Sequence, residues 1–261
     1  TYDGGENWQA AISIGKNEIR SIAIDPKAKC TIYVASKNKV FKSIDCSRSW
    51  SQVYYDTDLS VTVNTIAIDH YDSSNIFIGV SRGDIIKSSD RGGSWRAIGR
   101  LEGKILKIEI ALEDSRIIFV GTDKQGLYRS NDGGNIWEDL SKRLKEFKDS
   151  SNFKDIAVSK SKPGFIILAT KYGLLKSADY GDNWSKVELL TPEKDAIINA
   201  LAISPKNENE IYYLTNTTFY RSLDGGQNWA TKKLPSSRAG LEIIIDPQDT
   251  KIIYLGVGVK K

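Results

Sequence analysis

The chain has 261 residues and a formal net charge of +4, from 37 Lys+Arg against 33 Asp+Glu. This charge is small and evenly spread, which argues against nucleic acid as a partner. No apolar run approaches the ~20 residues of a membrane-spanning helix, so the sequence predicts no transmembrane segment. The chain starts with Thr and contains no Met. We therefore expect a processed or truncated form, and an export signal lost from the N-terminus is compatible with it.

An eight-residue motif recurs six times, approximating Ser-x-Asp-x-Gly-x-x-Trp. The copies are TYDGGENW (1–8), SIDCSRSW (43–50), SSDRGGSW (88–95), SNDGGNIW (130–137), SADYGDNW (177–184) and SLDGGQNW (222–229). Their aspartates are Asp3, Asp45, Asp90, Asp132, Asp179 and Asp224, so successive ones lie 42, 45, 42, 47 and 45 residues apart. Their tryptophans are Trp8, Trp50, Trp95, Trp137, Trp184 and Trp229. Self-similarity at this period is the signature of a repeat architecture.

Between these motifs, each repeat contains the same succession of short apolar runs. The first runs are 18–26, 63–71, 105–113, 153–161, 198–206 and 241–249. The second runs are 31–35, 75–80, 116–122, 165–170, 210–215 and 251–257. The third runs are 39–43, 84–88, 126–130, 173–177 and 218–222. Runs rich in Ile, Val and Tyr between turn residues predict strands, and a shorter, more polar fourth run follows each Trp. Only 141–149 has a helical pattern.

Four antiparallel strands per repeat, with a buried inner pair and a polar outer edge, predict one blade of a β-propeller. The motif falls where the third strand turns into the fourth. Asp bonds to backbone N–H groups in a tight turn, Gly permits positive φ, and Trp fills the gap between neighbouring sheets. The motif is therefore interpreted as a structural staple. Ser47 replaces the Gly of the second copy, so that turn is expected to be the most irregular.

The two ends of the chain complement each other. Residues 241–257 supply two strands of a blade, and residues 1–14 supply a motif and a fourth strand. The interval from Asp224 round to Asp3 is 261 − 224 + 3 = 40 residues, close to the others. The sequence thus predicts one domain over 1–261: an all-β, six-bladed propeller whose N- and C-terminal segments share one blade. A seven-bladed ring cut short is the alternative.

The six motifs resemble the Asp-box or BNR repeat over nearly the whole chain. This repeat occurs in sialidases, xyloglucanase-type glycoside hydrolases, sortilin-type receptors and photosystem II stability/assembly-factor propellers, and the short loops look most like the last two. The resemblance implies the fold rather than one activity. Sialidases are expected to carry an Arg-Ile-Pro motif, whereas the nearest match here is IRSI (19–22). Xyloglucanase-type enzymes resemble two facing propellers, and one ring supplies half of such a cleft.

The two cysteines fall in one predicted blade. Cys30 begins its second strand and Cys46 ends its third, and a hairpin centred on 37–39 places them opposite each other. We predict a disulfide, with a pair of free thiols as the alternative, and an exported protein (secreted, periplasmic or cell-surface), because oxidising compartments favour the bond. The single His, His70, is interpreted as a turn residue. The sequence predicts no metal site and no cofactor.

Propeller function is expected at the axial mouth, where each first strand begins. The residues there form a mixed polar ring: Arg20, Asn64, Lys107, Lys154, Asp155, Asn199 and Glu242. Connections 54–62 and 189–197 border the same mouth. Basic residues also precede five motif aspartates by three positions (Lys42, Lys87, Arg129, Lys176 and Arg221), and these are interpreted as structural.

The predicted function is non-catalytic: a protein- or glycan-binding scaffold, as a monomeric domain or part of a larger assembly, with no catalytic residue assigned. The alternative is a glycoside hydrolase, which requires two carboxylates at the mouth, one with a raised pKa. The acidic residues available for that role are Glu18, Asp56, Asp58, Asp155 and Glu242.

Overall fold

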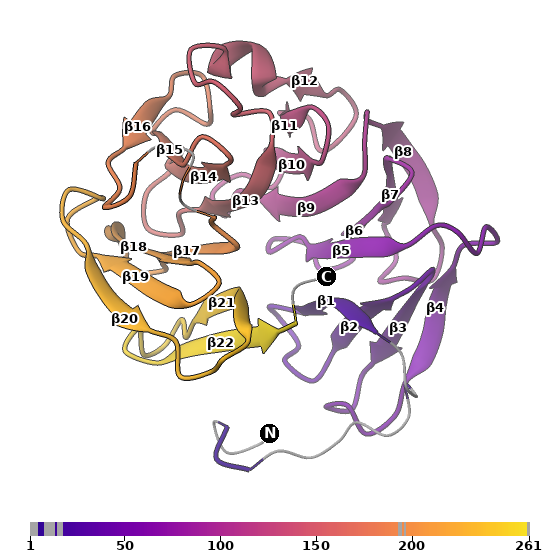
Figure 1. The fold of residues 1–261 in the computed structure, drawn as a ribbon. Helices are drawn as coiled ribbons and strands as arrows, with labels where there is room; N and C mark the ends of the chain where they lie inside the picture. Colours follow the sequence, from indigo (N-terminus) through magenta and orange to yellow (C-terminus); the bar gives the residue numbers. More distant parts are fainter. Residues whose placement is uncertain (1–4, 8–13, 15–17, 193–194, 196, 260–261) are drawn as a thin grey trace.

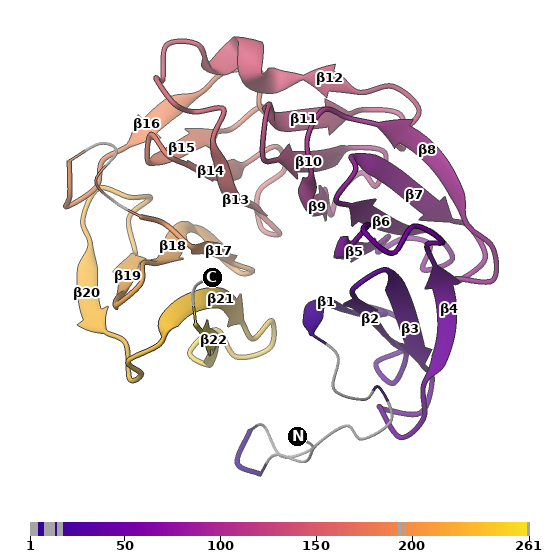
Figure 2. The ribbon, with the colours of Figure 1, turned by 45° about the vertical axis from the view of Figure 1, so that its right-hand side comes forward.

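The computed structural model describes residues 5–7, 14, 18–192, 195 and 197–259, and within them it is built from 22 β-strands. Five sheets have four strands and a sixth has two, all pairs antiparallel, which we label sheets A to F in chain order. The sheets stand around a common axis (Figure 1; Figure 2). This confirms the predicted all-β propeller architecture of four-stranded blades.

The strands follow the predicted apolar runs closely. Sheet A contains β1 (Ile19–Ile24), β2 (Ile32–Ser36), β3 (Lys39–Ser43) and β4 (Ser51–Tyr55). Sheet B contains β5 (Val63–Ile68), β6 (Ile76–Val80), β7 (Asp84–Ser88) and β8 (Arg96–Arg100). Sheet C contains β9 (Ile105–Ile110), β10 (Ile118–Thr122), β11 (Gly126–Ser130) and β12 (Glu138–Asp139).

The second half of the chain repeats the plan. Sheet D contains β13 (Phe153–Val158), β14 (Ile166–Thr170), β15 (Leu174–Ser177) and β16 (Ser185–Val187). Sheet E contains β17 (Ala200–Ser204), β18 (Asn207–Leu214), β19 (Thr218–Ser222) and β20 (Ala230–Lys233). Sheet F contains β21 (Ala239–Ile245) and β22 (Ile253–Gly258). A 3-10 helix, η2 (Leu140–Leu144), overlaps the first part of 141–149, the stretch where the sequence indicated helix. Among the described residues, no helix has the length and apolar character needed to cross a membrane.

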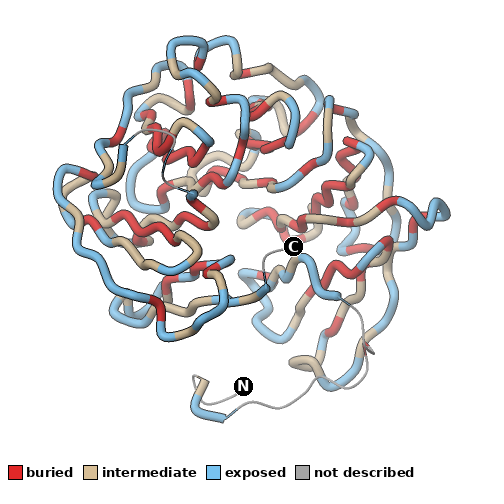
Figure 3. Tube along the Cα trace, in the orientation of Figure 1, coloured by how far each residue is buried: buried red, intermediate tan, exposed pale blue. Residues whose placement is uncertain are grey.

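The hydrophobic core is divided into layers between consecutive sheets. Separate apolar clusters join sheets A and B, B and C, C and D, D and E, and E and F. The second strands β6, β10 and β14 are buried at every position, because each lies inside its sheet with an apolar layer on both faces. Buried residues accordingly concentrate in the inner strands, and exposed residues in the outer strands and turns (Figure 3).

The five described motif turns, which we call boxes, share one hydrogen-bond pattern. In the sheet B box, Ser88 Oγ donates to Asp90 Oδ1 (2.8 Å), and the Gly92 and Ser94 backbone N–H groups donate to Ser88 Oγ (2.8 Å) and Asp90 Oδ1 (2.8 Å). Equivalent bonds occur in the other four. One carboxylate and one hydroxyl therefore hold each turn.

The expectation that the turn at Ser47 is irregular was wrong. Cys46 and Ser47 adopt positive φ, as Arg91 and Gly92 do in the sheet B box. The Ser47 N–H donates to Ser43 Oγ at 2.9 Å, as the Gly does elsewhere. The side-chain hydrogen bonds thus hold a non-glycine residue in the left-handed region that usually favours Gly.

The predicted disulfide between Cys30 and Cys46 is present, and no described cysteine is free. The Cys46 N–H also donates to the Cys30 carbonyl at 3.1 Å. Sheet B has the same backbone bond, from Arg91 to Ser74 at 3.1 Å. The disulfide therefore reinforces, in sheet A alone among the described sheets, a contact that the fold makes elsewhere without it.

The basic residues before the boxes have structural contacts, as interpreted from the sequence. Lys42 Nζ donates to the Arg91 carbonyl (2.9 Å), and an Arg129 N–H donates to the Tyr180 carbonyl (2.9 Å). Both carbonyls belong to the residue after the box Asp of the next sheet. Lys42 and Lys87 also lie over the rings of Tyr33 and Phe77. Lys42 and Arg129 therefore join the boxes of consecutive sheets.

The junction between sheets F and A differs from the other five. Ile22 and Ile24 of β1 are 63% and 57% exposed, and Ile244 of β21 is 55% exposed. Figure 2 shows β1 across a gap from β21 and β22. We call this junction the seam. The predicted box residues Asp3 and Trp8, and the strand expected after them, lie outside the described residues.

Candidate functional site

The two ends of the sheets carry different chemistry. The box face holds the boxes and the turns between first and second strands. The mouth face holds the turns between second and third strands (37–38, 81–83, 123–125, 171–173, 215–217) and the described parts of the connections between sheets (56–62, 101–104, 140–152, 188–192, 197–199, 234–238). The mouth face is where the sequence places the candidate binding residues.

Three of those candidates are β-bulge residues. The ladders skip one residue near the mouth end of the innermost strands, at Arg20 in β1, Asn64 in β5 and Lys154 in β13. A bulge bends the strand and re-aims its side chains. Sequence reasoning had no signal for these bulges, because an unpaired residue looks like any other in the pattern.

Both asparagines among the candidates link neighbouring sheets. Asn64 Nδ2 donates to the Ile105 carbonyl of sheet C at 2.8 Å, and Asn199 Nδ2 donates to the Gly240 carbonyl of sheet F at 2.9 Å. Arg20 lies 3.6 Å from Glu18. Asn64 and Asn199 therefore stabilise the arrangement of the innermost strands, whatever they contact in addition.

The ladders also skip one residue at 106 in β9 and at 241 in β21. In all five strands, the residue directly after the bulge pairs with a small residue of the second strand. Such residues are Ser21 (opposite Ala35), Thr65 (Gly79), Lys107 (Gly121), Asp155 (Ala169) and Glu242 (Gly256). They occupy the same register in five different sheets, and we call them the polar layer. The structure thus brings Lys107, Asp155 and Glu242 to one level around the axis.

Asp155 is the most constrained member of the polar layer. Its Oδ1 accepts from Lys107 Nζ and from the Ile156 N–H, each at 2.8 Å, and its Oδ2 accepts from the Leu201 N–H at 2.8 Å. The residue is buried. Its carboxylate therefore already has an ammonium and two backbone donors, which join sheet C to sheet D and sheet D to sheet E.

Electrostatics couple the polar layer across the axis. Partial burial opposes the charge of Lys107, but Asp155, Glu109 and Glu242 together raise the pKa of Lys107 above its ordinary range. Burial raises the pKa of Glu109 and of Glu242, and Lys107 only partly offsets this. Three carboxylates thus share one ammonium, and two of them hold protons more tightly than a solvated Glu does.

Glu109 is the residue that sequence reasoning missed. It lies 3.6 Å from Lys107. In the register of the first strands its position corresponds to Ala23, Ala67 and Ala157. Alignment of the repeats would have exposed a single Glu in a column that is otherwise apolar, and this was the available signal.

The acidic candidate Asp56 belongs to a buried hydrogen-bond network between sheets A and B. It is buried and accepts from Arg82 (3.0 Å) and from Tyr54 Oη (3.0 Å). Burial opposes its charge, but the bonds to Arg82, to the Asp58 N–H and to Tyr54 lower the pKa of Asp56 overall. Arg82 also pairs with Asp84, which pairs with Arg100. This network fixes the connection between sheets A and B.

The remaining candidates lie apart from the polar layer. Asp58 is exposed in the 56–62 connection, where it accepts from the Ser60 hydroxyl at 2.7 Å. Glu18 and Lys154 are exposed, and His70 lies on the box face, where burial and Lys160 lower its pKa. In the part of the chain that the structure describes, no group of His, Cys, Asp and Glu is suited to a metal ion.

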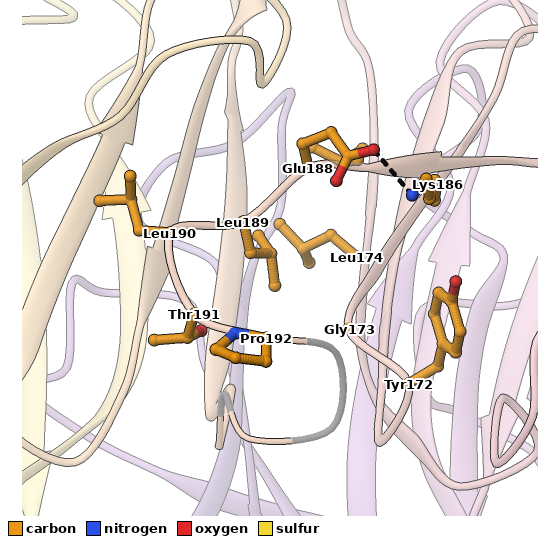
Figure 4. A pocket seen from close by; sticks show the side chains of 10 residues that line it. Tyr172, Gly173, Leu174, Lys186, Glu188, Leu189, Leu190, Thr191 and Pro192 are labelled. Atoms are coloured by element: carbon orange, nitrogen blue, oxygen red, sulfur yellow. Dashed lines mark ion pairs between the residues drawn. The ribbon is translucent and has the colours of Figure 1, made fainter.

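A pocket of about 290 Å³ opens at the rim of the mouth face beside sheet D (Figure 4). Its walls come from the turn at Tyr172, from Leu174 and Val187, and from 189–192 at the start of the next connection. Leu174 and Val187 are buried, while Leu190 is exposed. The pocket therefore joins an apolar base to an accessible edge.

A second hollow, of about 430 Å³, lies on the box face between sheets A and B. It is lined by Trp50, Val53 and box residues such as Asp90 and Gly92. These residues already hold turns or pack between sheets. We therefore place the candidate site on the mouth face, in the polar layer and the rim pocket.

The fold resembles several solved propellers. A GH74 enzyme from Niastella koreensis superposes with a TM-score of 0.74 and 16% identity, over 91% of this chain and 43% of that one. A GH74 xyloglucanase from Xanthomonas campestris gives 0.71 and 18%, over 92% and 44%. YCF48 from Cyanidioschyzon merolae gives 0.55 and 13%, over 92% of both chains. The chain spans less than half of these GH74 chains, and identities this low show the fold alone.

Sequence comparison adds the family. No curated protein matches the chain significantly. A family model described as photosynthesis system II assembly factor YCF48 matches residues 99–244, which is more than half of the chain. This region contains three boxes, all of sheet D and the rim pocket. The chain therefore belongs to the photosynthesis system II assembly factor YCF48 family of BNR-repeat propellers.

Proposed function

We propose that the protein is a non-catalytic propeller that presents its mouth face to a partner, with a protein favoured over a glycan. The family description names an assembly factor, a role carried out through protein contacts. The rim pocket supplies an apolar recess on that face. Arg20, Asn64, Lys107, Lys154, Asp155, Asn199 and Glu242 are the mouth residues through which we propose that contacts extend toward the axis.

The observation that carries this proposal is the state of Asp155. A catalytic acid or base must exchange a proton with substrate, whereas the Asp155 carboxylate accepts bonds from Lys107 and from two backbone N–H groups. Freeing it would leave Lys107 without its closest partner. Asp155 therefore serves as a structural link, which suits a rigid binding platform.

We also propose that 1–261 form one six-bladed domain, closed at the seam. Ile22, Ile24 and Ile244 make an apolar surface on both sides of the seam, and contiguous exposed apolar surface marks a surface that is normally covered. The Asp246 pKa is lowered by backbone hydrogen bonds and, to a lesser extent, by Lys206 and Lys29. Because Lys29 belongs to sheet A, the charge coupling across the seam supports closure. The disulfide supports our placement of the protein in an exported compartment.

The alternative function, a glycoside hydrolase, rests on one specific observation. Glu109 and Glu242 both have raised pKa values near Lys107, and a glycosidase needs one such acid. The fold similarity to GH74 enzymes does not decide the matter, since unrelated functions share this fold.

Site-specific photo-crosslinking in cells tests the binding face. A crosslinking amino acid is placed at Leu59 and Leu190 on the mouth face, and at Ile44 and Ile136 on the box face. All four side chains are exposed, so each tolerates the change. We expect discrete protein adducts from the mouth positions only. Adducts confined to the box face would contradict the proposal.

A turnover assay tests the alternative. Purified protein is incubated with a panel of polysaccharides, with Glu242→Gln and Glu109→Gln as variants that remove one titratable carboxyl each. The binding proposal expects no hydrolysis by any of the three. Hydrolysis that either variant abolishes would establish the enzyme instead.

A further inference from the structure

We propose that the rim pocket takes an apolar side chain from an acidic segment of the partner protein. The inference rests on the proposed binding function and names the partner's chemistry at one place on the mouth face. It depends on the shape of the pocket, on the charges beside it and on an unpaired hydroxyl in its wall.

The pocket fits one bulky side chain rather than a cofactor. Its volume of about 290 Å³ is at the lower limit of the ~300–1,000 Å³ typical of small-molecule sites. Leu174 and Val187 form the buried base, Leu189 lies beside Leu174 in Figure 4, and Pro192 completes the apolar lining. Leu190, 59% exposed, stands at the edge. An apolar side chain inserted here would cover surface that otherwise meets water.

Three lysines lie close in sequence to Tyr172, which lines the pocket, or to Phe147, which packs against Tyr172. The Tyr172 and Phe147 rings pack edge to face with centroids 5.4 Å apart, which brings the 140–152 connection next to the pocket. Lys145 and Lys148 flank Phe147 in sequence, and the Lys171 N–H donates to the Asn152 carbonyl at 3.0 Å. All three lysines are exposed.

None of these three lysines forms an ion pair with a residue that the structure describes. Lys186, at the opposite wall, is paired with Glu188 at 2.8 Å, so it adds little net charge. The acids beside these lysines are Glu146, which is exposed, and Asp149, which is half-buried, so the three lysines leave an excess of one positive charge there. Charge complementarity therefore favours an acidic segment over a basic or neutral one.

The Thr191 hydroxyl is a third feature of the pocket. Its oxygen is buried and has no hydrogen-bond partner within the described part of the chain. An unpaired buried polar group is costly, so a peptide group from a bound segment would improve its environment. The apolar recess suits an apolar side chain, the excess positive charge suits an acidic residue beside it, and the unpaired hydroxyl suits a peptide group. Together they favour a short peptide with an acidic flank.

Selection from a random peptide library displayed on phage tests the inference with the intact 261-residue chain. We expect enriched peptides to combine a Leu, Ile or Phe with Asp or Glu close to it. The best of these, as a labelled synthetic peptide, should bind less tightly as salt rises, because the lysines are exposed. Enrichment of basic or purely polar peptides, or of none, would overturn the inference.

Matched variants then locate the contact. Leu190→Asp is expected to weaken binding of that peptide about tenfold or more, as loss of a central apolar contact does, and Lys171→Glu about three- to tenfold. Leu59→Asp changes an exposed Leu in the equivalent connection after sheet A, and Lys124→Glu changes an exposed Lys in the equivalent turn of sheet C. Both controls should leave binding unchanged.

Equal effects of the variants and their controls would show that the pocket is not the binding place. If adducts from the mouth face persisted in that case, the proposed function would stand and only this inference would fall. If the mouth-face adducts were also absent, both would fall.

Discussion

The tetrapeptide Ile-Ala-Ile-Asp occurs twice, at 22–25, where β1 ends, and at 66–69, where β5 ends. The two copies have the same ladder register in their sheets. Ile66 and Ile68 are both 7% exposed, because they pack against sheet A. Ile22 and Ile24 are 63% and 57% exposed, because they face the seam.

The comparison separates the apolar pattern, which the strand's own sequence determines, from the burial of its side chains, which the neighbouring sheet provides. The apolar pattern of β1 is that of an interior strand, and its backbone pairing with β2 is regular after the bulge. Burial, however, is a property of two sheets together. The seam is therefore the junction at which the ring model can be tested most directly.

The largest expected effect comes from truncating the equivalent isoleucines. Ile66→Ala should lower the free energy of unfolding by about 2–5 kcal/mol, since it leaves a cavity between sheets A and B. If the seam is closed in solution, as we propose, Ile22→Ala should cost a similar amount. Chemical denaturation of both variants measures this.

The control for that comparison is Ile44→Ala on the box face. Ile44 is 71% exposed, so its truncation should change stability by less than about 0.5 kcal/mol. A result for Ile22→Ala that matches Ile44→Ala would mean that the seam stays open and the six-bladed ring is wrong.

The disulfide is expected to have the next largest effect, because it secures the sheet that borders the seam. Cys30 and Cys46 are separated by 16 positions, and a cross-link of this loop length contributes about 3 kcal/mol by limiting the unfolded chain. The double variant Cys30→Ser/Cys46→Ser should lose most of this in chemical denaturation. Addition of a reductant should destabilise the original chain similarly and leave the double variant unaffected.

A smaller difference is expected at the bulges. Asn64→Ala removes the bond to the Ile105 carbonyl between sheets B and C and should cost about 1 kcal/mol. Arg20→Ala removes, at the equivalent bulge beside the seam, a pair with Glu18 at 3.6 Å; pairs this exposed contribute about 0–1 kcal/mol. Thermal unfolding of the two variants compares the junction between sheets B and C with the seam. A larger loss of stability for Arg20→Ala than for Asn64→Ala would contradict our view that the seam has the weaker polar link.

The smallest effect concerns pH and the boxes. Hydrogen bonds from the Ser94 hydroxyl, the Ser94 N–H and the Ser88 hydroxyl lower the pKa of Asp90 from 3.8 to about 2. A carboxyl whose pKa is depressed in the folded state stabilises the fold above its unfolded pKa of ~3.9 and loses this as pH falls through the folded value. Thermal stability should therefore decrease between about pH 4 and pH 2.

Asp90→Asn isolates that contribution. The variant should be less stable than the original chain at neutral pH, and the two melting curves should converge toward pH 2, because the original Asp is then protonated. A stability difference that stayed constant with pH would show that the carboxylate charge at this box plays no part.

Much of the fold could be predicted because its signals are local. The box spacing predicts the repeat, the apolar runs predict the strands, and the hairpin geometry of one repeat predicts the Cys30–Cys46 disulfide. Each of these depends on residues close in sequence or equivalent between repeats, so a single chain is enough to recognise them.

The site could be predicted less well because its contacts join different sheets. Lys107 and Asp155 are 48 residues apart, and the sequence did not show that Asp155 also accepts from the Leu201 N–H. Asp56 was a candidate acid because its partner Arg82, in the next sheet, could not be identified from the pattern. The rim pocket depends on how one connection folds over sheet D, and no sequence motif predicts the conformation of that connection.

One consequence of the box geometry concerns engineering. The residue between the Ser and the Asp of each box takes no part in the shared hydrogen bonds, and Ile44 and Leu223 at this position are 71% and 54% exposed. Ile44, Ser89, Asn131, Ala178 and Leu223 therefore offer five attachment points, one in each described box, on the face opposite the mouth. Ligands coupled there would be displayed multivalently, and the mouth face would remain uncovered.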